Sequence, residues 1–312
     1  MPTMRLEGIH HITAITADAR ANVDFYARVL GLRLVKKTVN FDAPDVYHLY
    51  YADEAGSPGS VLTFFEFPGA AAGRAGAGMI HTIAMRVAGD SALDFWQSRL
   101  EAEAVGVRRH EGRLRFSDPE GLRFELVVDD VADPPLAADA PDIPPGHALL
   151  GFAGVRAYTS QPAAARDLLE QALGFSPIGN GGYRAAGEQR GATYLYDPPP
   201  PRPGSQGAGT VHHIAWSSRD DEEQQLWRRR VAQHGARPTP IIDRIYFHSV
   251  YFREPNGVLF ELATRGPGFT VDEPLARLGE ALMLPERYEP MRERLERTLT
   301  PLANPRVRAP AR

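Results

Sequence analysis

Four segments of the chain repeat one order of apolar and polar positions. A β-branched run over 8–16 is followed by apolar residues at helical spacing over 21–32, which predicts a strand and then a helix. The same order recurs over 151–159 and 163–175. In both segments a glycine ends the helix at the equivalent place, so we interpret the two as copies of one unit.

A second pair of segments follows the same plan. Residues 78–85 are similar to residues 209–216, and a tryptophan-containing helix is expected after each. Two similar hairpin sequences, RFSDPEGLRFEL over 115–126 and YFREPNGVLFEL over 251–262, close these segments. The chain is therefore predicted to be an α+β protein of four βαβββ modules, which begin near residues 7, 78, 150 and 209.

An acidic segment with five prolines, residues 129–148, separates the two halves of the repeat. Such a composition is typical of a linker between domains. We therefore expect two tandem domains with modules 1 and 2 in the first and modules 3 and 4 in the second. The expected boundaries are 5–130 for the N-terminal domain, 131–147 for the linker, 148–265 for the C-terminal domain and 266–312 for a helical tail.

Composition and charge exclude several classes of function. The chain has no cysteine, which removes disulfides, Cys-ligated zinc, iron–sulfur clusters and thiol nucleophiles. Any metal must therefore be held by nitrogen and oxygen atoms. With a net charge of −4 there is no global basic field for nucleic acid, and no apolar stretch is long enough to span a membrane. We expect a cytoplasmic protein, and a homo-oligomer is compatible with the sequence.

Two histidine pairs, His10–His11 and His212–His213, occupy the same point of modules 1 and 4. Because side chains alternate along a strand, only one histidine of each pair can face a given cleft. Module 2 keeps the first histidine of the pair, as His81, but has a threonine at the second. The second position, which only modules 1 and 4 fill with histidine, is therefore the candidate for chemistry.

A carboxylate completes this group. Glu261 lies within the apolar run VLFELA, where its burial is costly unless it is paired or binds a metal. Module 2 has Glu125 at the matching position but lacks the two histidines, and module 1 is expected to place Phe64 there, with Glu66 two residues out of register. The complete set of donors is therefore His11, His213 and Glu261.

Two imidazoles and one carboxylate with open coordination positions form the facial triad of non-haem Fe(II) oxygenases. Mn(II) and Zn(II) accept the same donors, so Fe(II) is favoured by the donor set and not fixed by it. A fourth protein ligand would favour a closed or lyase-type site, and Phe64 argues against one.

Turn chemistry adds a tyrosine to the site. Pro255-Asn256-Gly257 fits a three-residue hairpin loop with glycine in the left-handed region. In that register Tyr251 opposes Glu261, and opposed side chains lie roughly 5 Å apart on one face of a sheet. Its phenol can then donate or accept a proton beside the ligands. By alternation from His11, Thr13 shares the same face.

The sequences GIHHITAIT, GTVHHIAW, residues 47–67 and SVYFREPNGVLFELAT together resemble the vicinal oxygen chelate superfamily, which includes glyoxalases, bleomycin-resistance proteins and extradiol dioxygenases. Within it, the chain most resembles the hydroquinone ring-cleaving dioxygenases, a family typified by 2,6-dichlorohydroquinone 1,2-dioxygenases. The resemblance spans residues 5–300.

The resemblance implies an Fe(II)- or Mn(II)-dependent enzyme that uses O2 to open a small dihydroxylated aromatic ring. It implies that modules 1 and 4 share one metal-holding cup and that modules 2 and 3 form an empty one. The metal ligands that it implies match His11, His213 and Glu261. The pocket residues that it implies fall on His10, Thr13, His212, Arg244 and Tyr251. Residues 246–248, Tyr-Phe-His, depart from the family pattern and put the chlorinated substrate in doubt.

Two other functions stay open at this point. A glyoxalase-like metal-dependent isomerase or lyase would need a fourth ligand, for which Glu66 is the nearby candidate. A protein of the same fold could also bind small planar molecules without chemistry. Bound iron would favour the oxygenase, zinc or nickel the isomerase, and no metal the binding protein.

The tail is expected to contain a helix that starts near Pro290, with Met291, Leu295 and Leu299 in one apolar stripe. Because it follows Glu261 closely, the surface it covers is expected to be the sheet of module 4. It is either a packing strut or a lid that places Phe269 at the pocket mouth.

Overall fold

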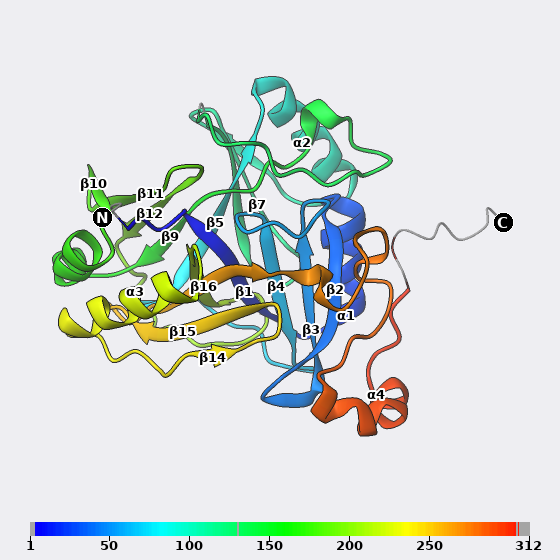
Figure 1. Ribbon diagram of the computed structural model, residues 1–312. Helices are drawn as coiled ribbons and strands as arrows, with labels where there is room; N and C mark the ends of the chain where they lie inside the picture. Colours follow the sequence, from blue (N-terminus) through cyan, green and yellow to red (C-terminus); the bar gives the residue numbers. More distant parts are fainter. Residues whose placement is uncertain (1–3, 130, 304, 306–312) are drawn as a thin grey trace.

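The computed structural model describes residues 4–129, 131–303 and 305. Its strands form two eight-stranded sheets (Figure 1). The first has the order β14 (Ile242–Asp243), β15 (Phe247–Arg253), β16 (Leu259–Pro267), β13 (Val211–Ser218), β1 (Ile9–Thr16), β4 (Val61–Glu66), β3 (Ala43–Ala52) and β2 (Arg33–Asn40). The second has the order β10 (Ser176–Gly179), β11 (Gly182–Ala186), β12 (Gly191–Asp197), β9 (Phe152–Tyr158), β5 (Ile80–Val87), β8 (Arg123–Val128), β7 (Arg113–Ser117) and β6 (Arg108–His110).

This topology confirms the α+β fold of four modules. Modules 1 and 4 form the first sheet through the antiparallel pair β1–β13, and modules 2 and 3 form the second through β5–β9. Each sheet therefore takes one module from either side of residues 131–147. The histidines of modules 1 and 4 meet because of this exchange.

Helices cover the outer faces of the sheets. In module 1, α1 (Ala19–Val23) continues as a π-helix, and the corresponding segment of module 3 is a 3-10 turn followed by a π-helix. The tryptophan-containing helices are α2 (Asp90–Ala102) against β7 and β8, and α3 (Asp221–Gln233) against β15 and β16. Trp96 in module 2 and Trp227 in module 4 are both fully buried, so the repeated tryptophan is a core residue in each of these two modules. None of the helices described is long and apolar enough to cross a bilayer.

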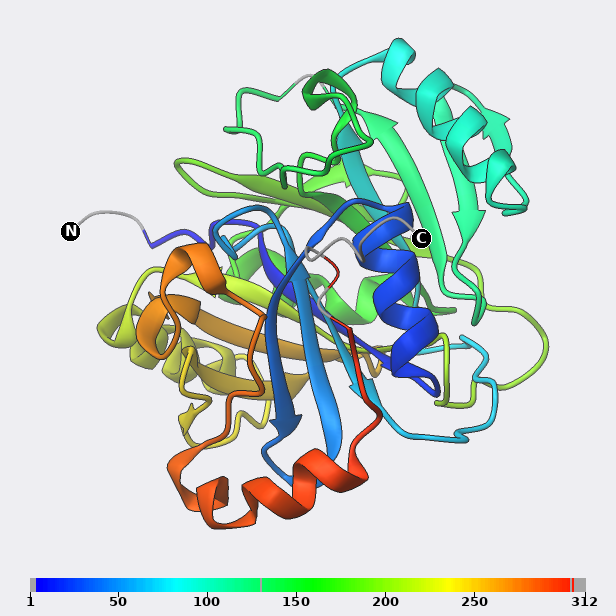
Figure 2. The same cartoon turned by 90° about the vertical axis from the view of Figure 1, so that its right-hand side faces the viewer.

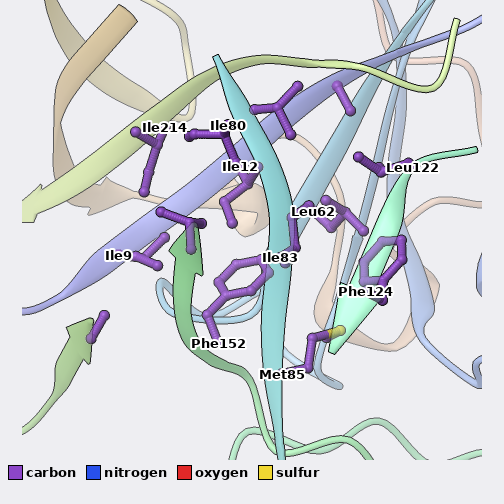
Figure 3. Close-up of a cluster of buried hydrophobic side chains, with 14 of the residues drawn as sticks. Ile9, Ile12, Leu62, Ile80, Ile83, Met85, Leu122, Phe124, Phe152 and Ile214 are labelled. Atoms are coloured by element: carbon purple, nitrogen blue, oxygen red, sulfur yellow. The ribbon is translucent and has the colours of Figure 1, made fainter. Parts of the chain in front are cut away.

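One apolar core joins the two sheets. Figure 3 shows Ile12 of β1 and Ile80 and Ile83 of β5 within one cluster, together with Phe124 and Ile214. All five side chains are at most 2% exposed. Burial of each contributes about 1.5–3 kcal/mol, so the central strands that carry the metal candidates are held on a rigid support.

The strand register corrects one expectation from the sequence. In the first sheet His11 pairs with Val61 of β4 and Thr13 with Thr63, while Ala215 of β13 pairs with Glu261. Because His11 and His213 are equivalent, the position in module 1 that matches Glu261 is Thr63. The prediction of Phe64 at this position was wrong by one residue, since the loop between β3 and β4, residues 53–60, is too long for its turn residues to fix the strand register.

The tail also differs from expectation in its location. From Leu282 onward it runs along the strands of module 1 and not those of module 4, as Figure 2 shows for the red helical segment beside the blue strands. Leu282 bridges to Lys37 of β2, and the hydroxyl of Tyr288 donates to the carbonyl of Phe41 at 2.8 Å. Helix α4 (Arg292–Thr298) then packs near β3. Strands of modules 1 and 4 share one sheet, so proximity in sequence was a poor guide.

The side chains of the tail support a structural role. Leu295 and Leu299 are buried, and Met291 packs against the core, as the expected stripe requires. Phe269 is buried against Tyr50 and Tyr246 at ring-centroid distances of 5.2 and 5.1 Å. It does not line the cavity described below.

Truncation of one side chain of the tail distinguishes a structural role of the tail from a role as a lid. Leu295→Ala should lower the free energy of unfolding by about 2–5 kcal/mol, because it leaves a cavity under α4. The KM for substrate should stay unchanged in the folded protein. Chemical denaturation and steady-state kinetics measure the two quantities. A raised KM at unchanged stability would contradict the structural role and favour the lid.

Candidate metal centre

The three predicted ligands converge at the centre of the first sheet. Oε2 of Glu261 lies 2.9 Å from Nε2 of His213 and 3.2 Å from Nε2 of His11. The two Nε2 atoms are 3.3 Å apart. All three side chains are buried, and this is the one group of at least three such side chains within metal-binding reach among the described residues.

His10 determines which nitrogen of His11 is free. Nε2 of His10 lies 3.0 Å from the carbonyl of Thr264, which can only accept, so this nitrogen carries the hydrogen. Burial, and then the neighbouring His11, lower the pKa of His10 to about 3, so its ring is neutral and its Nδ1 is an acceptor. Nδ1 of His11, 3.0 Å away, must therefore be the donor. The lone pair of His11 is left on Nε2, which faces Glu261.

The second histidine pair is arranged in the same way. Nδ1 of His212 lies 2.8 Å from Nδ1 of His213. Burial, and then His213, lower the pKa of His212 to about 4, which leaves a neutral ring able to accept. Such a partner on the far nitrogen is typical of metal-binding histidines, because it fixes the tautomer and the ring orientation.

Glu261 is held by one oxygen and free at the other. The hydroxyl of Ser249 donates to Oε1 at 2.5 Å. Oε2, although close to both imidazoles, receives no hydrogen bond of acceptable geometry from the described residues. Nε2 of His11, Nε2 of His213 and Oε2 of Glu261 thus lie close together in a buried place, where a bound cation would compensate the repulsion between their lone pairs. The residues present therefore fit a metal ion bound by two imidazoles and one carboxylate.

A small cavity, of about 40 Å³, opens onto the ligands. Three of the five expected pocket residues, Thr13, Arg244 and Tyr251, line it together with His11 and His213. His10 and His212 do not line it and stand behind the ligand rings.

Phe247, in the segment that departs from the family pattern, also lines the cavity and packs on His11 at 4.9 Å between ring centroids. Its neighbours in the chain turn elsewhere. The hydroxyl of Tyr246 donates to Asp272, and His248 pairs with Asp221. Of the three residues of this segment, only Phe247 therefore lines the cavity.

Tyr251 and Arg244 form a polar pair on one wall of the cavity. Tyr251 pairs with Glu261 across β15 and β16, and Gly257 has a φ of 105°, as the expected hairpin requires. Nε of Arg244 lies 3.4 Å from the Tyr251 hydroxyl, and its guanidinium also reaches Asp42 at 3.1 Å. Burial and the carboxylate of Glu261 raise the pKa of Tyr251, so its phenol keeps its proton.

The sequence of the chain matches a known protein family. A family model described as Glyoxalase/Bleomycin resistance protein/Dioxygenase superfamily matches residues 8–126 and 150–262. These ranges make up more than half of the chain and contain all three converging side chains. The chain belongs to this superfamily.

Two curated relatives within the superfamily match almost the whole chain. A protein of Bacillus subtilis (strain 168), which carries the provisional name ring-cleaving dioxygenase MhqO, is 44% identical over 94% of this chain and 96% of its own length. A chlorohydroquinone/hydroquinone 1,2-dioxygenase of Sphingobium indicum is 35% identical over 95% of this chain and 96% of its own.

Solved structures agree on the fold. A crystal structure from Bacillus subtilis, described provisionally as a dioxygenase, superposes with a TM-score of 0.90 at 42% identity and covers 97% of this chain and 99% of that one. Glyoxalase I from Zea mays superposes with a TM-score of 0.59 at 15% identity, over 83% of this chain and 92% of that one. The second likeness shows the superfamily fold alone.

Four polar residues of the cavity were not predicted from the sequence: Asn40, Asp42, His48 and Tyr50, the last two in β3. The hydroxyl of Tyr50 lies 2.8 Å from Nδ1 of His48. Burial, followed by the charges of His11 and His213, lowers the pKa of His48 well below its ordinary value. The spacing of two residues between His48 and Tyr50 in a strand puts both on one face. Tyr50 lies opposite Thr63 as Tyr251 lies opposite Glu261, so the two tyrosines are counterparts, whereas the counterpart of His48 is Ser249.

The second sheet forms the expected twin cup without the donors. It holds an open cleft of about 1060 Å³, far larger than the cavity at the ligands. Gly154 pairs with Ala84 in the second sheet as His11 pairs with Ala215 in the first, so Gly154 occupies the position of His11. Thr82 occupies the position of His213. Size alone would single out this cleft, but the one imidazole that lines it, that of His81, is paired with Asp197 at 3.0 Å.

The carboxylate of the second cup is already neutralised. Arg113 and Arg115 bind the two oxygens of Glu125 at 2.6 and 2.7 Å. Arg115 pairs with Glu125 across the strands as Tyr251 pairs with Glu261. In the second cup, two guanidinium groups thus balance the charge of the carboxylate, which a metal cation would do in the first.

We therefore expect one metal per chain. Glu125→Ala should leave metal content and oxygen uptake unchanged and lower stability by about 1–3 kcal/mol through the lost charged hydrogen bonds. Metal analysis of wild type and variant checks both statements. A stoichiometry near two, reduced to one by Glu125→Ala, would contradict the asymmetry of the two cups.

Proposed function

We propose that this chain is a metal-dependent ring-cleaving dioxygenase that acts on a hydroquinone or a related dihydroxylated aromatic, with Fe(II) as its metal and Mn(II) as the alternative. The observation that carries the proposal is the convergence of three lone-pair atoms of His11, His213 and Glu261 on the wall of a polar cavity. The similarity to a chlorohydroquinone/hydroquinone 1,2-dioxygenase along almost the whole chain supports the reaction class.

The donor set leaves room for chemistry. Two imidazoles and one carboxylate would hold the metal through three protein donors, and Fe(II) bound there would supply the chemistry that activates O2 toward the ring. The matching fourth position holds Thr63, whose hydroxyl is engaged with Thr13 at 2.8 Å. The site therefore keeps its open side.

Tyr251 and Arg244 would orient the ring and handle its protons. The phenol of Tyr251 keeps its proton beside the carboxylate of Glu261 and can donate it to an oxygen in the cavity. Arg244, 3.4 Å away, holds that phenol in place and supplies positive charge to a ring oxyanion. Because the cavity is small, admission of a ring requires side chains of its wall to move.

The isomerase and binding functions have less support. Glu66, the candidate fourth ligand, accepts hydrogen bonds from the backbone of Ala19 at 3.1 Å and from Thr300 at 3.2 Å, away from the other donors. A pure binding protein has no need for a buried carboxylate oxygen without a hydrogen bond.

Metal loading tests the proposal. Apoprotein is loaded without oxygen with Fe(II), Mn(II) or Zn(II), and O2 uptake is followed with substituted hydroquinones and catechols. We expect rapid uptake with Fe(II), slower or comparable uptake with Mn(II) and none with Zn(II). Activity confined to the zinc form, on a thiol adduct of an α-ketoaldehyde and without O2, would instead establish the isomerase.

A further inference from the structure

A row of four hydrogen-bonded side chains runs along one wall of the cavity. The hydroxyl of Tyr50 lies 2.8 Å from Nδ1 of His48, Nε2 of His48 lies 2.8 Å from the hydroxyl of Thr63, and that hydroxyl lies 2.8 Å from that of Thr13. Thr13, Thr63 and Tyr50 are direct neighbours across β1, β4 and β3. The two ends of the row therefore stand two strand spacings, roughly 10 Å, apart at the backbone.

Three of the four side chains of the row, including both of its ends, line the cavity. Thr13, His48 and Tyr50 line the cavity, and Thr63 is fully buried outside it. Thr13 lies two residues from His11 on the same face of β1, so its end of the row is the one beside the metal ligands. Tyr50 forms the distant end.

If the hydrogen of the fully buried Thr63 is to be paired, the row can order its hydrogens in two ways. A neutral imidazole has one N–H, so it donates on one side and accepts on the other. If Tyr50 donates to His48, then His48 donates to Thr63 and Thr63 to Thr13, which leaves the hydrogen of Thr13 without an acceptor among the described residues. In the reverse order the spare hydrogen belongs to Tyr50.

In both orders, the two ends of the row therefore offer opposite hydrogen-bonding groups to the cavity. When Thr13 offers a hydrogen to the cavity, the oxygen of Tyr50 offers a lone pair, and the reverse order exchanges the two. An oxyanion beside Thr13 selects the first order, because it needs a donor. The distant end then accepts a hydrogen from a neutral hydroxyl of the same ligand.

We propose that His48 is a positioning residue that couples Thr13 to Tyr50, and that the row selects a ligand with one ionised oxygen beside Thr13 and one protonated oxygen beside Tyr50, such as the monoanion of a hydroquinone. This inference rests on the proposed function and adds to it the protonation state of the two oxygens.

Two probes test the coupling without turnover. Hydroquinone and 4-methoxyphenol, which lacks the second hydroxyl hydrogen, are titrated calorimetrically into Fe(II)-loaded protein without oxygen. Wild type should bind hydroquinone about 10–100-fold more tightly, because the methoxy group leaves the acceptor at Tyr50 unpaired. In Tyr50→Phe this ratio should fall to about 3-fold or less, since that acceptor is gone.

Thr63→Val tests the coupling itself, because it severs the row at a residue that does not touch the ligand. It should lower the ratio about 3–10-fold at unchanged iron content. Thr38→Val is the matched control: Thr38 is a fully buried threonine of the same sheet whose hydroxyl has no hydrogen-bond partner among the described residues. It should leave the ratio as in wild type.

The outcomes separate this inference from the proposed function. If wild type consumes O2 with hydroquinone but the ratio stays unchanged in Tyr50→Phe and Thr63→Val, the row does not select the ligand and the inference is wrong. If Thr63→Val does not fold, an unchanged ratio in Tyr50→Phe still overturns it. If wild type shows the ratio and its loss but consumes no O2, the inference stands and the dioxygenase function fails.

Discussion

Replacing His11, His213 or Glu261 with alanine should remove the bound metal and lower turnover by more than about 1,000-fold, or roughly 4 kcal/mol in the barrier. The reason is that a site with three protein donors has no spare ligand, and the fourth matching position is held by Thr63 in hydrogen bonds. Metal content by elemental analysis and O2 uptake at saturating substrate measure the two effects.

The neighbouring histidines provide matched controls. His10→Ala and His212→Ala should retain metal at stoichiometric loading, with an affinity lower by about 10–100-fold, because they only orient the ligand rings through Nδ1. Loss of metal in His212→Ala together with its retention in His213→Ala would show that the assignment is wrong by one residue.

The second large effect is expected at Tyr251. Tyr251→Phe should lower kcat by about 100- to 10,000-fold, the range of a lost acid–base group, while metal content and stability change little. The phenol lies opposite Glu261 and beside Arg244, and phenylalanine keeps its ring contact with His213, at 5.7 Å between centroids. Single-turnover kinetics with preloaded metal separates this effect from metal loss.

A tyrosine of the second cup serves as the control for Tyr251. Tyr158 stacks on His81 at 3.8 Å between ring centroids and accepts a hydrogen bond from Arg123. Tyr158→Phe should leave kcat unchanged. An equal loss in both variants would mean that the two phenols act through folding and not through the reaction.

The convergence of His11, His213 and Glu261 was predictable because the repeat supplied an internal comparison. Module 2 keeps the first histidine but not the second, and this contrast in the sequence distinguishes His11 and His213 from His10 and His212. Glu261 followed from the cost of a carboxylate in an apolar strand. The hairpin rule for residues 255–257 then placed Tyr251, and the register agrees.

Other features had no such signal. The one-residue error at Phe64 arose where the turn before β4 could not be counted, and only strand pairing identified Thr63. His48 lies in a strand with ordinary alternation and differs from a surface histidine only through its partners across the sheet. The place of the tail depended on which modules share a sheet, a property of topology that no local pattern contains.

The most direct test of the central claim is the fate of isotopically labelled oxygen. Fe(II)-loaded protein is supplied with hydroquinone and ¹⁸O2, and the product is examined by mass spectrometry after a short reaction. A ring-cleaving dioxygenase should consume one O2 per ring and give an open-chain unsaturated acid that contains both labelled atoms. Oxidation of the hydroquinone to an unlabelled quinone, or recovery of the ring unchanged by fully loaded protein, would contradict the proposed function.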